Sequence, residues 1–125
     1  MTTQEVATMI AGIGLPYAYD HFTDDDKPEG PPFICFFYPN SDDLMADNVN
    51  YQAITALVIE LYVDNKDFAS EAAIEAALTT SELPWAKAET WIDSENMYQV
   101  TYETEVLLTA APDNTEVLTT DGEQG

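Results

Sequence analysis

Hydrophobic and polar residues alternate most regularly between Tyr51 and Val63, with the two-residue period of a β-strand. One side of this segment is apolar and the other is mixed; the apolar side consists of Leu57, Ile59, Leu61 and Val63. At about 3.4 Å per residue the strand is roughly 44 Å long, whereas a usual strand measures about 17–20 Å. A compact core of this size does not need such a length, so we expect part of the strand to contact another chain.

A second long alternating segment, 97–109, forms the last part of a predicted hairpin. A strand over 85–92 and the turn formers of 93–96 precede it. Its apolar side consists of Tyr98, Val100, Tyr102, Val106 and Leu108. The opposite side carries Gln99, Thr101, Glu103 and Glu105. This alternation is typical of an antiparallel sheet with one face buried and the other in contact with water.

Two helices accompany these strands. The first begins at Thr2, where a threonine and a glutamate three residues later form a capping box, and it ends at Gly12 and Gly14 before Pro16. The second covers about 68–80, behind the polar capping segment 64–67. Its predicted apolar stripe, rich in alanine and therefore suited to close packing on a sheet, consists of Phe68, Ala72, Ile74, Ala77 and Leu78.

Two shorter strands are expected at 17–22 and at 33–38. The second is almost continuously apolar, which predicts burial on both of its faces or contact with a neighbouring chain. The proline-rich segment between them is a loop. A polar segment, 39–50, follows the second strand, and its most prominent apolar residues are Leu44 and Met45.

The order of these elements predicts an α+β fold in a single domain, residues 1–110. It comprises an N-terminal helix, a mainly antiparallel sheet with long strands, one helix packed on the sheet and a C-terminal hairpin. Residues 111–125 lose the periodicity and gain acidic residues and turn formers, so we expect a mobile acidic tail there.

Charge narrows the choice of function. The chain contains 24 Asp and Glu residues but only Lys27, Lys66 and Lys87 as basic residues, which gives a formal net charge of -21. Binding to DNA or RNA requires lysines and arginines that neutralise phosphates, so sequence-specific nucleic-acid binding is not expected. An anionic membrane surface is disfavoured for the same reason, and no apolar stretch of about 18 residues could span a bilayer. A basic partner, a nucleic-acid mimic, a surface that must not adhere to nucleic acid, and simple solubility are all compatible with this charge.

Residues that carry catalytic chemistry are scarce. The chain has one cysteine, Cys35, within an apolar run, and one histidine, His21, in a predicted strand. The triple aspartate 24–26 lacks the ligand spacing of an EF-hand loop, and no phosphate-binding loop, zinc-ligand set or nucleophile elbow is present. Acidic residues at strand positions fit the solvent-facing side of a sheet. We therefore expect no enzyme activity, no metal and no cofactor.

The long strands point to assembly instead. A long free edge exposes N–H and C=O groups that can pair with a strand of another chain, and such pairing suits a homo-oligomeric ring. An extended hairpin within a monomer would account for the same pattern. The residues predicted to contact other subunits or partners are Leu44, Met45, Tyr51, Tyr62, Trp91, Met97 and Tyr98.

Three segments together resemble a family of phage proteins: IGLPYAYDHF, PPFICFFYPNSDDLMADNVNYQAITALVIELYVDNKDF and WIDSENMYQVTYETEV. They are similar to small siphophage and prophage proteins of Gram-positive bacteria encoded among head–tail joining genes, and through them to tail terminator (tail completion) proteins. The resemblance covers residues 9–108 and contains no catalytic motif. It implies a hexameric ring that caps the tail tube and contacts the tube protein and the head connector. It also implies a place in the virion tail or neck, after assembly in the cytoplasm of the bacterial host.

Two alternatives to this role stay open. An acidic DNA mimic that inhibits a host nucleic-acid-processing enzyme would present carboxylates where DNA presents phosphates. A tail or neck adaptor would bind a basic partner without forming a ring.

Overall fold

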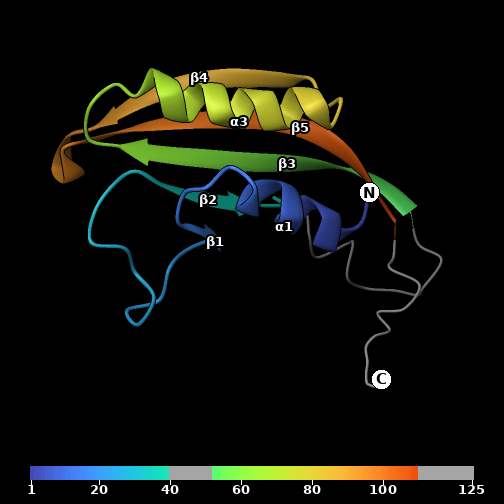
Figure 1. Ribbon diagram of the computed structural model, residues 1–125, viewed down its shortest axis with the longest axis horizontal. Helices are drawn as coiled ribbons and strands as arrows, with labels where there is room; N and C mark the ends of the chain where they lie inside the picture. Colours follow the sequence, from blue (N-terminus) through green and yellow to red (C-terminus); the bar gives the residue numbers. More distant parts are fainter. Residues whose placement is uncertain (40–51, 110–125) are drawn as a thin grey trace.

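The computed structural model describes residues 1–39 and 52–109, and these form an α+β fold in which helices lie on a five-stranded sheet (Figure 1). The elements are α1 (Thr3–Ala11), β1 (Tyr17–Tyr19), β2 (Phe33–Phe37), β3 (Gln52–Val63), α3 (Phe68–Thr80), β4 (Trp85–Ile92), the 3₁₀ turn η1 (Asp93–Glu95) and β5 (Met97–Thr109). The predicted fold class is confirmed. The expected tail, 111–125, lies outside the described residues.

The strands follow the order β1-β2-β3-β5-β4 across the sheet. All neighbouring strands are antiparallel except β1 and β2, which are parallel. β1 is shorter than the predicted strand 17–22, because Asp20 adopts a left-handed conformation (φ 67°) that ends the extended backbone. Beyond it the chain turns back, and the ring of Phe22 packs edge-on against Phe33 of β2 at 5.5 Å.

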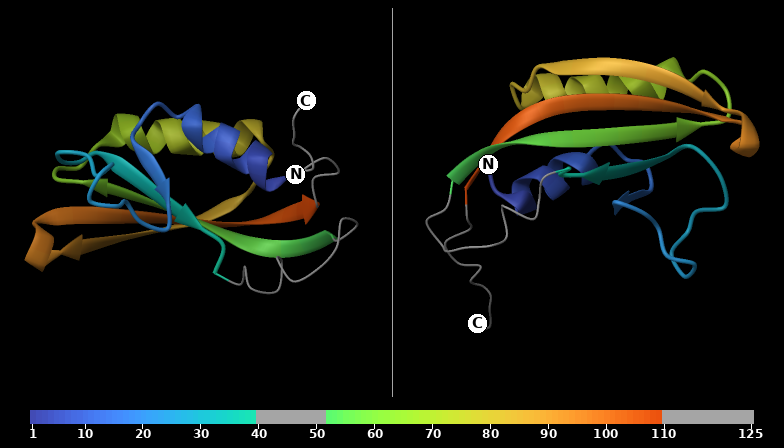
Figure 2. Two further views of the ribbon diagram at one scale, coloured as in Figure 1. Left: turned by 90° about the horizontal axis from the view of Figure 1, so that it is seen from below. Right: turned by 180° about the vertical axis from the view of Figure 1, so that it is seen from behind.

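The core lies between one face of the sheet and the two helices, which both cover that face (Figure 2). The alternation in β3 and β5 is confirmed, because the predicted apolar sides of both strands are buried. The following residues have no exposed surface: Val6, Ile10, Ile34, Leu57, Ile59, Leu61, Ile74, Leu78, Val100 and Tyr102. Of the two alternatives predicted for β2, the structure shows burial on both faces, since Ile34, Cys35 and Phe36 are all buried.

Both helices begin with the predicted caps. In α1, the Thr2 hydroxyl accepts from the Glu5 N–H at 3.1 Å and the Glu5 carboxylate accepts from the Thr2 N–H at 2.8 Å. In α3, the Asp67 carboxylate accepts from the Ser70 N–H at 3.0 Å.

The predicted apolar stripe of α3 is partly wrong. Ile74 and Leu78 are buried as expected, but Phe68 is 72% exposed and Ala72 is exposed. The turn of α3 that precedes Ile74 places Ser70 and Glu71 against the sheet, and Phe68 lies outside this face with the Lys66 ammonium 5.2 Å from its ring. A polar pair of residues therefore occupies the first buried turn.

Candidate interaction surface

The two long strands extend beyond their outer neighbours at the same end of the sheet (Figure 1). β3 and β5 pair with each other along the whole of β3. β2 pairs with β3 only over 58–62, and β4 pairs with β5 only over 97–104. Segments 52–57 of β3 and 105–109 of β5 therefore project past β2 and β4.

The expectation of a long free edge on β3 is corrected in part, because β3 lies inside the sheet between β2 and β5. Its outer side lacks a strand partner over 52–57 and at Val63, as far as the described residues go. The projecting end of β5 is contacted by the start of the chain: the Met1 nitrogen donates to the Leu107 carbonyl at 3.0 Å, and the Thr109 N–H donates to the Met1 carbonyl at 2.9 Å.

The face of the sheet opposite the helices carries the two most exposed of the large apolar side chains of the strands. No helix among the described residues crosses it (Figure 2). Ile54 and Leu107 are direct cross-strand partners on the projecting segments, and 71% and 50% of their surfaces are exposed. We call this side of the sheet the open face. Such a pair at the end of a sheet face that no described helix covers is typical of a protein contact.

The open face is also acidic. Glu103 and Glu105 are exposed on it, and Glu60 is half-buried beside them in β3. None of the residues that the described strands direct to this face is basic, since the one strand lysine, Lys87, lies on the side of α3. A basic partner could approach this face with electrostatic attraction.

Tyr62, predicted as a contact residue, is held within its own chain. Its ring stacks on Phe33 at 5.0 Å, and its hydroxyl donates to a Glu60 carboxylate oxygen at 2.9 Å and accepts from the Gln99 amide at 3.3 Å. Burial, together with the hydrogen bond to Glu60, raises the pKa of the Tyr62 phenol. It is half-buried, so an interface role would involve the edge of its ring only.

The other described candidates gather at the far end of the hairpin. The Trp91 and Tyr98 rings lie 4.8 Å apart on the helix side of the sheet, and the Trp91 indole donates to Asp93 at 3.3 Å. Trp91 is 45% exposed, whereas Tyr98 and Met97 are half-buried. The remaining candidates, Leu44, Met45 and Tyr51, lie outside the described residues. Contact of these residues with another chain stays a prediction.

Sequence reasoning missed the pair of Ile54 and Leu107. Both belong to the mixed sides of the two strands, where the other residues are mostly small, polar or acidic. The sequence signal that could have indicated this pair is an isoleucine and a leucine on strand sides that otherwise face water. Their meeting across two strands depends on the register, which the alternation alone does not define.

A network of charged residues joins α3 to β4 and β5. The Glu71 carboxylate, 3% exposed, contacts the ammonium groups of Lys66 and Lys87, each at 2.8 Å. Lys87 also contacts Glu75 at 2.8 Å, Glu75 accepts from the Tyr102 hydroxyl at 2.8 Å, and Lys66 reaches Glu89.

This network shifts the titration of its carboxylates. Burial alone would raise the pKa of Glu71, but the hydrogen bonds from Lys66 and Lys87 outweigh it and hold that pKa below its usual value. The hydrogen bond from Lys87 likewise lowers the pKa of Glu75. Two of the three lysines of the chain are thus committed to the junction of α3 with β4.

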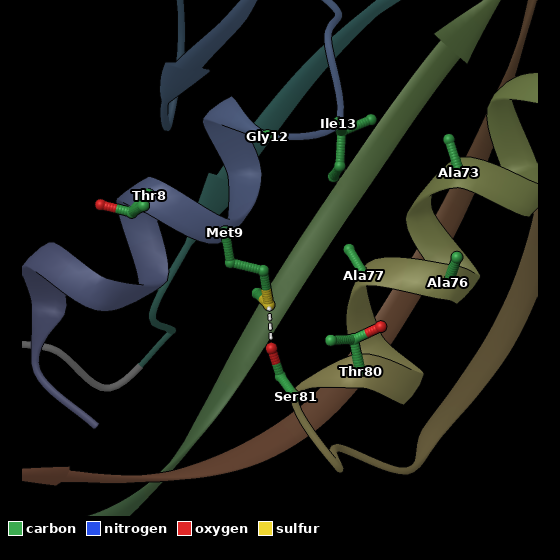
Figure 3. Close-up of a pocket in the computed structure, with 9 residues that line it drawn as sticks. All are labelled: Thr8, Met9, Gly12, Ile13, Ala73, Ala76, Ala77, Thr80 and Ser81. Atoms are coloured by element: carbon green, nitrogen blue, oxygen red, sulfur yellow. Dashed lines mark hydrogen bonds between the residues drawn. The ribbon is translucent and has the colours of Figure 1, made fainter.

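A shallow groove of about 380 Å³ runs between α1 and α3 (Figure 3). The Met9 and Ile13 side chains face Ala73 and Ala77 across it, and the Ser81 hydroxyl donates to the Met9 sulfur at 3.3 Å. No charged side chain lines the groove, and its polar side chains are the hydroxyls of Thr8, Thr80 and Ser81.

Other reactive side chains of the described chain are a cysteine and a histidine. Burial, followed by the charges of Glu60 and Asp20, raises the pKa of the Cys35 thiol to about 11, so the thiol stays protonated at neutral pH. His21 is exposed, with its Nδ1 2.9 Å from the neighbouring Asp20 carboxylate. No set of three or more metal-binding side chains comes together within residues 1–39 and 52–109. Neither described helix is long and apolar enough to cross a bilayer.

Comparisons with known proteins give one match. No protein family profile matches this chain, and neither does any curated protein sequence. A chain of a solved structure, described as "Virion of native gene transfer agent (GTA) particle", is similar to this one at 15% sequence identity. The match covers 84% of this chain and 88% of that chain, with a TM-score of 0.45. At this level of similarity, the match carries no conclusion about function.

Proposed function

We propose that this protein is a structural component of a phage virion, a ring-forming tail terminator that caps the tail tube and joins it to the head connector. The open face of the sheet, with Ile54 and Leu107 exposed at its projecting end, is the observation that carries the proposal. Two large, exposed apolar side chains side by side are typical of a surface that contacts another chain, as a subunit of an assembly does. The quoted resemblance to tail terminator proteins supports the specific role.

The charge of the chain fits the same role. DNA must pass through a terminator ring without adhering to it, and a surface with a net charge of -21 per subunit repels phosphates. Six such subunits also repel one another, so their contacts must use uncharged parts of the surface. The role is mechanical, and we propose no catalytic step for it.

The mass of the protein in solution tests the proposal. At micromolar concentration we expect a ring of several subunits, either for the protein alone or after mixing with its tail tube protein. Light scattering after size exclusion measures the mass, and electron micrographs of the mixture should show rings at tube ends. A single-subunit mass at high concentration, with no binding to the tube protein, would contradict the proposal.

Replacement of both Ile54 and Leu107 by threonine should weaken assembly without unfolding the subunit. Both side chains are largely exposed, so the free energy of unfolding should change by less than about 1 kcal/mol. The assembly or its binding to the tube should weaken at least about tenfold, since exposed apolar anchors dominate interfaces. Sedimentation and thermal unfolding measure the two effects.

Phe68→Thr is the matched control for that double substitution. Phe68 is equally prominent on the surface, at 72% exposure, but it lies on α3 away from the open face. Assembly of this variant should stay at the wild-type level. Equal losses in the control and the double variant would show that general surface hydrophobicity, not the open face, drives association.

A DNA mimic is the second candidate, because Glu103 and Glu105 are exposed on one face without a basic residue from the described strands between them. It would act as a monomer that binds a DNA-processing enzyme tightly and salt-sensitively. The apolar pair on the same face has no counterpart in a row of phosphates. Neutralising Glu103 and Glu105 as glutamines should abolish binding to such an enzyme under this alternative and leave ring formation intact under the main proposal.

A further inference from the structure

We infer that the outer edge of β4 is where a second copy of this chain adds a strand to the sheet. The inference rests on the proposed assembly and identifies which surface of the subunit builds it. β4 is the last strand of the sheet, opposite the short β1, and it runs for 8 residues. This is longer than a usual strand of about 5–6 residues, so the edge can form a full ladder of hydrogen bonds.

The direction of the backbone groups in β4 follows from the register. Thr109 and Leu107 of β5 bond to Met1 on the side away from β3, so odd-numbered residues of β5 direct their N–H and C=O groups toward the β4 side. Their partners in β4 are even-numbered, from Glu103 opposite Ala86 to Met97 opposite Ile92. The even residues of β4 therefore bond to β5, and the odd residues direct their backbone groups outward.

The opposite edge of the sheet gives the same result. Ile34 of β2 donates its N–H to the Pro16 carbonyl beside β1, so Cys35 faces β3. Because Cys35 pairs with Glu60, the backbone groups of Glu60 face β2 and those of Leu61 face β5. The backbone groups of Val100, the partner of Leu61, then face β3, and those of Thr101 face Ala88 of β4. The odd residues of β4 again direct their backbone groups outward. Within the described part of the chain, no hydrogen-bond partner meets these outward groups, which belong to Trp85, Lys87, Glu89 and Trp91.

The side chains of β4 leave this edge unguarded. Edge strands are commonly protected by charged side chains that stay free in solvent. Here Lys87 and Glu89 are the only charged residues of the strand, and ion pairs with Glu71, Glu75 and Lys66 draw them toward α3. On the open face the strand presents small exposed side chains, Ala86, Ala88 and Thr90. A neighbouring strand can therefore approach without displacing a free charge.

Charge identifies the occupant as a second copy. A basic partner would gain most from the acidic part of the open face around Glu60, Glu103 and Glu105, whereas another copy, with a net charge of -21, meets less repulsion where acidic residues are paired with lysines. β4 has one lysine and one glutamate, so its own charge sums to zero. The network around it pairs Lys66 and Lys87 with Glu71, Glu75 and Glu89, so the acidic residues of this strip are largely neutralised. A second acidic subunit therefore meets less repulsion at this strip than at the acidic part of the open face.

β1 is the weaker candidate for the same contact. It comprises 3 residues, and the left-handed Asp20 ends it, so it offers few backbone groups. In a ring, contacts run head to tail, and the edge of β4 meets a different surface of the next subunit. The experiment below tests the β4 side of that contact alone.

Two substitutions at Glu89 separate strand pairing from charge. Glu89→Pro and Glu89→Ala both remove the carboxylate and its contact with Lys66, but only proline removes the outward N–H. An edge strand tolerates proline where the N–H faces solvent. We expect the concentration needed for half-assembly to rise at least about tenfold in Glu89→Pro and to stay near the wild-type value in Glu89→Ala. Light scattering across a dilution series measures this, and circular dichroism confirms folding.

Hydrogen exchange on the unmodified protein gives a second readout that does not depend on a variant. In the assembled state, the amides of Lys87, Glu89 and Trp91 should exchange at least about tenfold more slowly than in the dilute, dissociated state. The inward amides of Ala88 and Thr90 serve as internal controls, because β5 protects them in both states.

The outcomes distinguish pairing at the β4 edge from the formation of a ring. An assembly that Glu89→Pro weakens, or that protects the outward amides, supports pairing at β4. An assembly that forms equally well with proline and leaves those amides unprotected overturns the β4 edge and leaves the proposed ring intact. A wild-type protein that stays a single subunit under all conditions overturns the ring and, with it, the role of this edge.

Discussion

Ile59→Asp is expected to leave the protein unfolded at room temperature. Ile59 has no exposed surface, lies in the middle of β3 and pairs with Phe36 on one side and Tyr102 on the other. An aspartate there would be either an unpaired buried charge or an unsatisfied neutral acid, and such changes cost more than about 4–5 kcal/mol. Because a domain of this kind is stable by about 5–15 kcal/mol, the loss approaches or exceeds the total. Circular dichroism and urea unfolding measure it.

Two controls make this expectation specific to the buried face. Ile54→Asp introduces the same charge in the same strand, but on the open face at 71% exposure, and should change stability by no more than about 1 kcal/mol. Ile59→Val removes one methylene group and should cost about 1 kcal/mol. If Ile59→Asp unfolded at the urea concentration of the wild type, the assignment of the core face would be wrong.

The alternation in β3 and β5 defined the core face from the sequence alone because the period of a strand is local. A residue's side depends only on its position relative to its neighbours, and so Leu57 and Val100 could be placed before any pairing was known. The bounds of α3, β4 and β5 were equally predictable, since capping and turn residues mark them: Asp67 before the helix and Asn96, in a left-handed conformation, after the 3₁₀ turn.

Contacts between distant segments were less predictable. The parallel pairing of Tyr17–Tyr19 with β2 brings together strands separated by a loop, and no local pattern specifies it. The position of β3 inside the sheet was missed for the same reason, because a long alternating strand has the same appearance at an edge and in the interior. Phe68 was assigned to the buried stripe by its hydrophobicity, but the rotation of α3 is determined by Ile74, Leu78 and the ion pairs of Glu71.

The candidate interface was predictable in kind but not in its residues. The predicted contact residues include the aromatic residues Tyr62 and Trp91, yet neighbouring rings and hydrogen bonds occupy much of both side chains. The apolar pair of the open face becomes visible only when the register aligns Ile54 with Leu107. Likewise, composition shows that lysines are few, whereas only the structure shows that Lys66 and Lys87 meet at one edge of the sheet.

The meeting of these lysines leads to a second large expected effect, the loss of stability on replacing Glu71 by glutamine. Glutamine keeps the shape of the side chain but leaves the ammonium groups of Lys66 and Lys87 close together without the carboxylate between them. Removing one partner from a buried ion pair costs about 3–5 kcal/mol, and the partial exposure of both lysines places this case near about 2–3 kcal/mol. Glu75→Gln is the matched control, because Glu75 contacts Lys87 from a more exposed position and should cost less than about 1 kcal/mol.

The effect of Glu71→Gln should vanish in acid. The folded protein lowers the pKa of Glu71 below its usual value of 4.5, so the carboxylate contributes stability above that pH, and the contribution is lost as the pH falls through the lowered pKa. We therefore expect wild type and Glu71→Gln to differ fully at about pH 7 and to converge as the pH falls below 4.5 through the lowered pKa of Glu71, while Glu75, whose pKa is also lowered, makes a smaller contribution in the same direction. Urea unfolding at a series of pH values measures the convergence. A difference that stayed constant down to the acid limit would show that shape or packing, rather than the charge of Glu71, stabilises the junction of α3 with β4.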